Sequence, residues 1–179
     1  MQQRQLGPFQ VSAIGLGCMN LSHAYGPPVS AEQGERVLLS ALDAGVTLFD
    51  TAALYGFGAN ETLVGKVMKP HRQKFTLASK CGMQGVDVAG DGKLVRVIDG
   101  RPETIKKTCE DSLRRLQTDV IDLYQIHWPE RHVPAFGTRY YDPAKEVSQT
   151  PIHEQLDALA GLVKAGKVRA IGLSNETPY

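Results

Sequence analysis

Short apolar runs with strand character alternate along this chain with segments whose apolar residues recur at helical spacing. Strands that alternate with helices build right-handed βαβ units, which place the strands parallel to one another in one sheet. The pattern therefore predicts a parallel sheet covered by helices. The five expected strands cover residues 13–19, 47–52, 75–80, 120–127 and 168–175.

Local signals mark the ends of the four helices expected between these strands. Ser30 and Gln33 form a capping box, and Gly45 is placed to end the helix that follows. Asn60 is a candidate N-cap for the second, shorter helix, which Pro70 is expected to end. Similar signals bound the last two helices: Pro102 at the start of one, and Thr150, Pro151 and Gly166 at the two ends of the other.

Two long loops indicate how the sheet is arranged. Residues 81–101 and 128–150 follow the third and fourth strands and are rich in turn-forming or irregular sequence. Long loops at the carboxyl ends of strands are typical of a (β/α)8 TIM barrel, which builds its sites there. A doubly wound sheet is the alternative, but Gly15-Leu16-Gly17 is not followed by the rest of the dinucleotide-binding pattern G-x-G-x-x-G.

We therefore expect an α/β fold in a single domain over residues 1–179: a TIM barrel that stops after its fifth strand. Residues 3–13 predict a short hairpin before the first strand, with its turn at Gly7-Pro8. A closed barrel takes about 250 residues, more than this chain has. The open sheet edges that result are expected to favour self-association.

Composition narrows the classes of function. The net charge is +1, with Lys+Arg 20 and Asp+Glu 19, which argues against binding to nucleic acid or to a membrane surface. The three cysteines are widely spaced and the histidines are scattered, so we expect neither disulfides nor a metal site. No signal peptide and no apolar stretch of ~18 residues is present, and a reducing cytoplasm is the expected location.

Four residues with acid–base chemistry stand at or just after the ends of expected strands: Asp50, Tyr55, Lys80 and His127. A phenol is a weak acid, with an ordinary pKa of ~10, and a neighbouring ammonium favours its ionised form. Lys80 can supply that ammonium, and Asp50 can hold it. Taken singly, each of the four has an ordinary structural explanation. Together they favour an acid that protonates a carbonyl oxygen while a cofactor gives hydride to the carbon.

Several motifs, in the same order, resemble the aldo-keto reductase family. GVTLFDTAALYG and NETLVGKVM are similar to the family's segment around its Asp and Tyr, and LASK to its Lys strand. LRRLQTDVIDLYQIHWP and KAGKVRAIGLSN are similar to its His strand and its fifth strand. The resemblance runs from about Leu6 to Asn175. GCMNLSHAYG and the long loops resemble the bacterial branch near the potassium-channel β-subunit-like reductases.

The resemblance implies an oxidoreductase that reduces small aldehydes or ketones to alcohols by hydride transfer from NADPH. It implies that Tyr55 is the general acid, that Lys80 makes it more acidic and pairs with Asp50, and that His127 orients the substrate carbonyl. The implied cofactor-binding residues are Gly17, Cys18, Met19, Asp50, Ser174 and Asn175, and the implied substrate-pocket residues are Tyr25 and Trp128.

Two alternatives stay open beside this interpretation. In the family, strands six to eight bind the adenosine half of the nucleotide, and no segment of this sequence corresponds to them. The chain is then either part of a nucleotide-binding regulatory subunit with little turnover, or an inactive half-barrel fragment that associates through its open edges.

Overall fold

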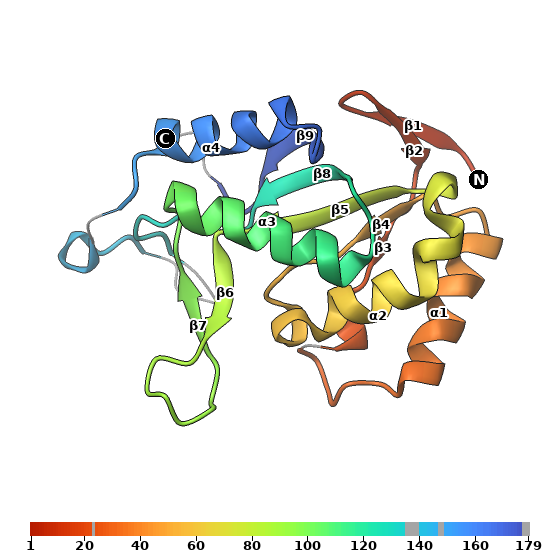
Figure 1. Ribbon diagram of the computed structural model, residues 1–179, viewed down its shortest axis with the longest axis horizontal. Coiled ribbons are helices and arrows are strands. Elements are labelled where there is room, and N and C mark those ends of the chain that lie inside the picture. Colours follow the sequence, from red (N-terminus) through yellow and green to blue (C-terminus); the bar gives the residue numbers. More distant parts are fainter. Residues whose placement is uncertain (23, 135–139, 147–148, 177–179) are drawn as a thin grey trace.

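The computed structural model of the protein describes residues 1–22, 24–134, 140–146 and 149–176. Five of its strands form one parallel sheet in the order β3-β4-β5-β8-β9 (Figure 1). These strands are β3 (Leu16–Gly17), β4 (Leu48–Asp50), β5 (Thr76–Cys81), β8 (Ile121–Ile126) and β9 (Val168–Leu173). A doubly wound sheet reverses its strand order at a switch point. Here the order follows the sequence throughout, as in the first five strands of a (β/α)8 barrel.

Four α-helices connect these strands and lie in a row against the sheet (Figure 1). They are α1 (Ala31–Asp43), α2 (Ala59–Met68), α3 (Pro102–Leu116) and α4 (Ile152–Lys164). The core lies between the helices and the sheet. Its fully buried side chains come from strands and helices alike: Phe49, Leu77, Tyr124, Leu38, Val64, Ile105 and Leu159. Among the described helices, none is long and apolar enough to cross a membrane.

Most of the expected helix ends are confirmed. The Ser30 hydroxyl oxygen accepts a hydrogen bond from the Gln33 backbone N–H at 3.1 Å, which caps α1. Gly45 (φ 85°) and Gly166 (φ 73°) follow α1 and α4 in the left-handed conformation that glycine adopts without strain. Pro102 opens α3, where its missing N–H has no helical partner to lose.

Two expected N-caps were wrong. The N-cap of α2 is Gly58, because the Asn60 side chain lies inside the helix and bonds to distant groups instead. This helix does end just before Pro70, as expected: its last residue is Met68, and Pro70 lies in the 3₁₀ helix that follows. Pro151, and not Thr150, is the N-cap of α4. The described 3₁₀ helices are Met19–Leu21, Tyr55–Gly58, Lys69–Lys74 and Pro143–Lys145.

The expected amino-terminal hairpin is confirmed and lies at the amino ends of the barrel strands (Figure 1). Its strands are β1 (Gln3–Leu6) and β2 (Phe9–Ser12), which pair antiparallel around a turn at Gly7. Ser12 and Thr47 join it to the sheet, because each side-chain oxygen accepts the other residue's backbone N–H, at 2.8 and 2.9 Å.

The prediction that residues 81–101 form a loop was wrong. They contain a second antiparallel hairpin, β6 (Met83–Val86) and β7 (Val95–Ile98). The carboxylate of Asp87 accepts hydrogen bonds from the backbone N–H groups of Gly90, Asp91 and Gly92, so it organises the connecting turn. The glycines and aspartates that suggested irregular structure therefore serve one turn between two strands.

Candidate active site

The four candidate catalytic residues, Asp50, Tyr55, Lys80 and His127, converge where the strands of the sheet have their carboxyl ends. We call these four residues the tetrad. Asp50 is the last residue of β4, Lys80 lies near the end of β5, and His127 follows β8 directly. Tyr55 begins the 3₁₀ turn that follows β4. Because adjacent strands are parallel and in register, with Asp50 beside Ala78 and Lys80 beside Gln125, these ends meet along one edge.

The Lys80 ammonium has an oxygen partner for each of its three hydrogens. It forms an ion pair with the Asp50 carboxylate, donates to the Thr51 carbonyl oxygen at 2.9 Å, and donates to the Tyr55 phenolic oxygen at 3.2 Å. Lys80 is only 6% exposed. Since an ammonium has three donors, this set fixes the orientation of the cation and directs one hydrogen at the phenol.

The Tyr55 ring lies close to both that cation and the His127 imidazole. The Tyr55 and His127 rings meet edge to face, with centroids 5.6 Å apart and planes at 87°. The Lys80 ammonium nitrogen lies 4.9 Å from the centroid of the Tyr55 ring. All three side chains are buried. A phenol, a cation and an imidazole are therefore gathered at one small, largely dry place.

The turn that carries Tyr55 has an unusual backbone. Gly56, Phe57 and Gly58 all have positive φ, at 55°, 50° and 97°. Two are glycines, which adopt this region freely, whereas Phe57 must be held there by its surroundings. The Phe57 ring packs on Gly85 of β6, where an added Cβ would lie only 2.2 Å from Cδ1. The β6–β7 hairpin thus supports the Tyr55 turn from one side.

Two residues that the sequence analysis did not single out as part of the site, Thr51 and Asn60, hold the strand ends together. Asn60 is fully buried. The Thr51 hydroxyl donates to the Asn60 amide oxygen at 2.6 Å, and the Asn60 amide nitrogen donates to the Cys18 carbonyl oxygen at 2.7 Å. A polar residue directly after the catalytic turn was the only available signal, and it also suits a helix cap.

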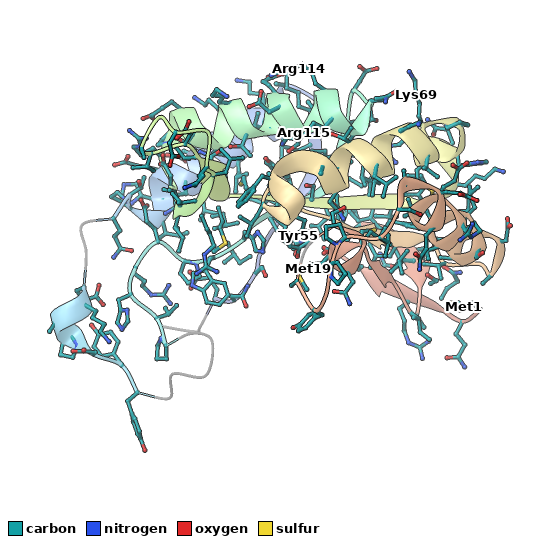
Figure 2. The ribbon with its side chains drawn as sticks, turned by 90° about the horizontal axis from the view of Figure 1, so that it is seen from below. Met1, Met19, Tyr55, Lys69, Arg114 and Arg115 are labelled. Atoms are coloured by element: carbon teal, nitrogen blue, oxygen red, sulfur yellow. The ribbon has the colours of Figure 1, made fainter. Side chains whose placement is uncertain are left out.

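The candidate cofactor residues at the end of β3 and just after it lie against the tetrad. Gly17 pairs with Asp50 in the sheet, and the Cys18 backbone N–H donates to the Asp50 carbonyl oxygen at 2.8 Å. Burial, and after it the nearby Asp50 carboxylate, raises the pKa of the Cys18 thiol to about 12. Met19 packs against the apolar cluster that includes Tyr55, and Figure 2 shows the two side by side.

Ser174 and Asn175 lie beside His127. The Ser174 backbone N–H donates to the Ile126 carbonyl oxygen, and the Asn175 side-chain amide donates to the His127 carbonyl oxygen, both at 2.9 Å. Asn175 has a φ of 60°, a conformation that asparagine tolerates better than most residues. The hydroxyl and amide of this pair thus stand next to the end of β8.

The two candidate substrate residues differ. Trp128 packs against the apolar cluster formed by Ala52, Leu54, Tyr55 and Met83. Tyr25, in contrast, is 88% exposed at the surface.

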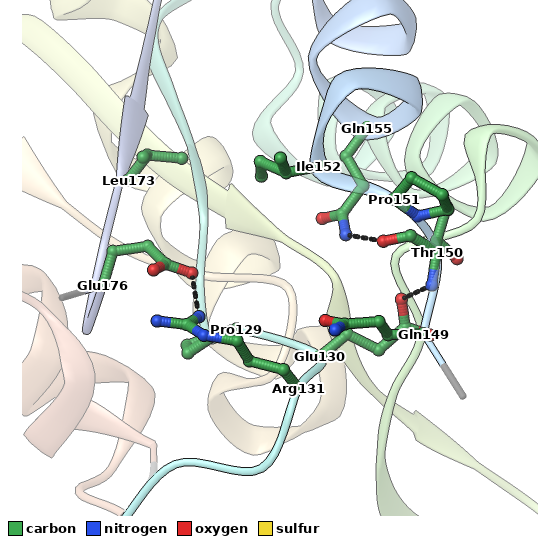
Figure 3. Close-up of a pocket in the computed structure, with 10 residues that line it drawn as sticks. All are labelled: Pro129, Glu130, Arg131, Gln149, Thr150, Pro151, Ile152, Gln155, Leu173 and Glu176. Carbon is green, nitrogen blue, oxygen red and sulfur yellow. Dashed lines mark hydrogen bonds and ion pairs between the residues drawn. The ribbon is translucent and has the colours of Figure 1, made fainter. Parts of the chain in front are cut away.

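A separate pocket of about 440 Å³ lies between the loop after β8 and the start of α4 (Figure 3). Arg131 forms an ion pair with Glu176 at 2.8 Å on one side of it. On the other side, the Glu130 carboxylate accepts the Thr150 backbone N–H at 2.8 Å. None of the tetrad residues lines this pocket, so it is separate from the tetrad. Among the described residues, no three His, Cys, Asp or Glu side chains gather as metal ligands.

Comparison with known proteins gives consistent matches. The model of the Aldo/keto reductase family matches residues 13–179. "Probable aldo-keto reductase 1" of Glycine max is 38% identical, over 99% of this chain and 47% of that protein. "Aldo-keto reductase yakc [NADP(+)]" of Schizosaccharomyces pombe is 38% identical, over 96% of this chain and 44% of that protein. The chain therefore spans about half the length of these curated relatives.

Solved structures match in the same way. The aldo-keto reductase AKR11C1 from Bacillus halodurans, in its holo form, superposes with a TM-score of 0.77 at 34% identity. The match covers 99% of this chain and 51% of that one. The five strands and four helices described above thus correspond to about half of a solved relative.

Proposed function

Because the chain belongs to the aldo-keto reductase family, we propose that the protein reduces aldehydes or ketones to alcohols with hydride from NADPH, and that Tyr55 gives the proton. The resemblance noted in the sequence is confirmed at the level of the family. Membership of the family does not by itself assign the activity, which we propose separately, because the chain covers only about half the length of its relatives.

The arrangement of Lys80 carries the proposal. Its ammonium touches the Tyr55 phenolic oxygen at 3.2 Å while Asp50 and the Thr51 carbonyl hold it in place. A fixed cation at that oxygen stabilises the charge that appears there when the proton leaves. A lysine with only a structural role would be stabilised as well by Asp50 alone and would not need a phenolic oxygen at its third hydrogen.

The residues at the strand ends fit the nicotinamide end of the cofactor. The Ser174 hydroxyl and the Asn175 amide match the donors and acceptor of a carboxamide, and the Asn175 amide is anchored at the carbonyl of His127. An added Cβ at Gly17 would meet no heavy atom within 4 Å, so this stretch leaves space beside Asp50. A bound dihydronicotinamide supplies the hydride.

The chain's own groups then handle the oxygen of the substrate. The carbonyl oxygen lies between Tyr55 and His127, whose imidazole orients it by a hydrogen bond. As the carbon gains hydride, the oxygen gains negative charge and takes the phenolic proton. Lys80 stabilises the phenolate that remains, and Asp50 holds the Lys80 ammonium in place. Trp128 packs against the apolar cluster that contains Tyr55 and excludes water from this side.

Two further observations support NADPH as the cofactor and the cytoplasm as the location of the protein. The name of the Schizosaccharomyces pombe relative carries NADP(+), and we extend that preference to this protein. Cys18, Cys81 and Cys109 are all free and buried, which suits a compartment that keeps thiols reduced.

The test uses the protein as its gene encodes it, with NADPH and 4-nitrobenzaldehyde, and follows the absorbance of NADPH. We expect Tyr55→Phe to lower kcat by roughly 10²- to 10⁴-fold, the usual worth of a general acid. Tyr140→Phe, which removes a phenol that is 82% exposed, should leave kcat unchanged. Full turnover in Tyr55→Phe would disprove the assigned acid, whereas tight NADPH binding without turnover in the unaltered protein would favour a regulatory nucleotide-binding role.

A further inference from the structure

A fully buried carboxylate, Glu61, lies in α2 and has no part in the proposed chemistry. Glu61 is 0% exposed, and a buried charge is costly unless it is paired and hydrogen-bonded. It accepts hydrogen bonds from the Ser79 hydroxyl at 2.5 Å, the Ser112 hydroxyl at 3.1 Å and the Arg115 Nε at 2.7 Å. The partners come from β5 and α3, so this one carboxylate joins α2 to two other elements.

The side chain of Arg115, which pairs with Glu61, lies directly against the turn that carries Tyr55. A Cβ added to Gly58 would come within 2.9 Å of Arg115 Cδ and 3.1 Å of its Nε. The guanidinium cannot easily withdraw, because Nε and Nη2 are both bound to the Glu61 carboxylate at 2.7 Å. Figure 2 shows Arg115 on the α3 side of the start of α2, with Tyr55 below it.

The contacts of Glu61 also extend to β5, the strand that carries Lys80. Ser79, which donates to Glu61, precedes Lys80 in β5, and successive strand residues point to opposite faces of the sheet. Glu61 therefore holds β5 from the helix side at the residue next to the catalytic lysine. Arg115 lies against Gly58 and Glu61 binds the Ser79 side chain, so this pair contacts the segments on both sides of the contact between Tyr55 and Lys80.

We infer that Arg115, clamped by Glu61, is a positioning residue that sets the Tyr55 phenol against the Lys80 ammonium. The inference rests on the proposed function for its catalytic consequence, but not for its geometry. Gly58 has a φ of 97° and leaves the space that the Arg115 stem fills, so the turn and the arginine fit only together. A lysine at position 115 keeps a charge but has no Nε donor or planar fork to hold the stem in place.

The test compares Arg115→Lys with a matched change near the amino ends of the sheet strands, opposite the tetrad. Arg72 also pairs with a buried carboxylate, Asp122 at 2.7 Å, and it lies before β5, away from the tetrad. Arg115→Lys and Arg72→Lys each weaken one such pair and are both expected to lower thermal stability. Only Arg115→Lys should lower kcat, by roughly ten- to a hundredfold, with the KM for NADPH changed less than about twofold.

A second measurement does not depend on activity. In protein carrying isotope-labelled tyrosine, the Tyr55 ring signal is assigned by its loss in Tyr55→Phe. It should move or split in Arg115→Lys and stay in place in Arg72→Lys. If the protein proves to have no reductase activity, the proposed function fails, yet this signal still decides whether Arg115 positions the phenol.

Should Arg115→Lys fail to fold, a milder pair gives the answer. Ser112→Ala removes one donor to Glu61. Ser12→Ala removes a comparably buried hydroxyl in β2, at the amino ends of the sheet strands. A Tyr55 signal that moves in Ser112→Ala alone supports the inference. An unmoved signal in the Arg115 or Ser112 variant, or an equal loss of kcat in both members of a pair, overturns it.

Discussion

The Lys80 ammonium lies 3.2 Å from the phenolic oxygen of Tyr55, and its remaining hydrogens are taken by Asp50 and by a backbone carbonyl. The cation therefore has no freedom to turn away from the phenol. Its position is set by the ends of two parallel strands, β4 and β5, and not by a mobile loop. A site built on strand ends holds its groups more accurately than one built on loops.

Replacing Lys80 should therefore remove catalysis without removing cofactor binding. We expect Lys80→Met to lower kcat by roughly 10²- to 10⁴-fold, because the phenol loses the cation that favours release of its proton. Lys74→Met, at an exposed lysine before β5, is the control and should match the unaltered protein. Steady-state rates with NADPH and an aldehyde test this, and equal rates in the two variants would contradict it.

Stability should fall in alkaline solution because of the buried thiols. Burial raises the pKa of Cys18 and of Cys81 from 9.0 to about 12, so the folded protein keeps both thiols protonated at pH values where the unfolded chain ionises them. The free energy of unfolding is thus unaffected below pH 9.0 and declines as the pH rises toward 12. Between pH 9 and 10 each thiol should cost about 1 kcal/mol.

Urea unfolding at a series of pH values measures this decline. The Cys81→Ala variant should show a shallower alkaline decline than the unaltered protein, because one ionising thiol is gone. The same burial predicts that the native thiols react with thiol reagents only after the chain opens. An alkaline slope that is identical in Cys81→Ala would show that other groups cause the loss.

Asp122 should matter for stability and not for chemistry. It is 1% exposed, and it accepts hydrogen bonds from Arg72 at 2.7 Å, from Arg169 at 2.6 Å and from the Leu77 backbone N–H at 2.7 Å. Asp122→Ala leaves two arginines near a buried site without their carboxylate, and should cost about 3–5 kcal/mol in urea unfolding. Asp111→Ala, which breaks only surface ion pairs, should cost less than about 1 kcal/mol.

Folded Asp122→Ala protein should retain its kcat, because the residue lies in the amino-terminal half of β8, away from the tetrad. A fall in kcat comparable with that of Lys80→Met would mean that this end of the sheet also controls the site.

The 179-residue chain should self-associate through its sheet edge. Ile171 and Leu173 of β9 are 39% and 49% exposed, and β9 pairs with β8 on one side only among the described strands. An exposed strand edge with apolar side chains is a template for pairing with another chain. Sedimentation of the 19.5 kDa chain should show species larger than a monomer that increase with concentration.

Ile171→Asp should weaken this association, whereas Val37→Asp, at a similarly exposed valine on α1, should not. A monomer at every concentration would rule out the edge as an association surface, and equal effects of the two variants would point to non-specific contact.

The sequence allowed the parallel order and the tetrad to be predicted because their signals are local. Ser30, Gly45 and Pro102 each act within one turn of their own helix, and each did what its residue type favours. The tetrad could be found because parallel strands bring their carboxyl ends to one edge, whatever the loops do. A few residues at strand ends were therefore enough to place it.

The supporting contacts could not be predicted, because their partners are distant in the chain. Asn60 has the type of a helix cap, yet it bonds to Cys18, and Glu61 has the type of an exposed helix residue, yet it is paired with Arg115. The β6–β7 hairpin was missed because its glycines and aspartates outweighed its short alternating segments. The packing of Phe57 on Gly85, and of Met83 in the apolar cluster with Tyr55, shows that this hairpin belongs to the site.

The sheet order has a consequence for how the molecule assembles. Each strand after β3 pairs with the sheet strand made just before it, so each of them has a partner that is already synthesised. A nascent chain can add β4, β5, β8 and β9 one at a time as they leave the ribosome. Once β8 and the residue after it have emerged, the aspartate, tyrosine, lysine and histidine are all present, and the pocket can take shape while translation is still under way.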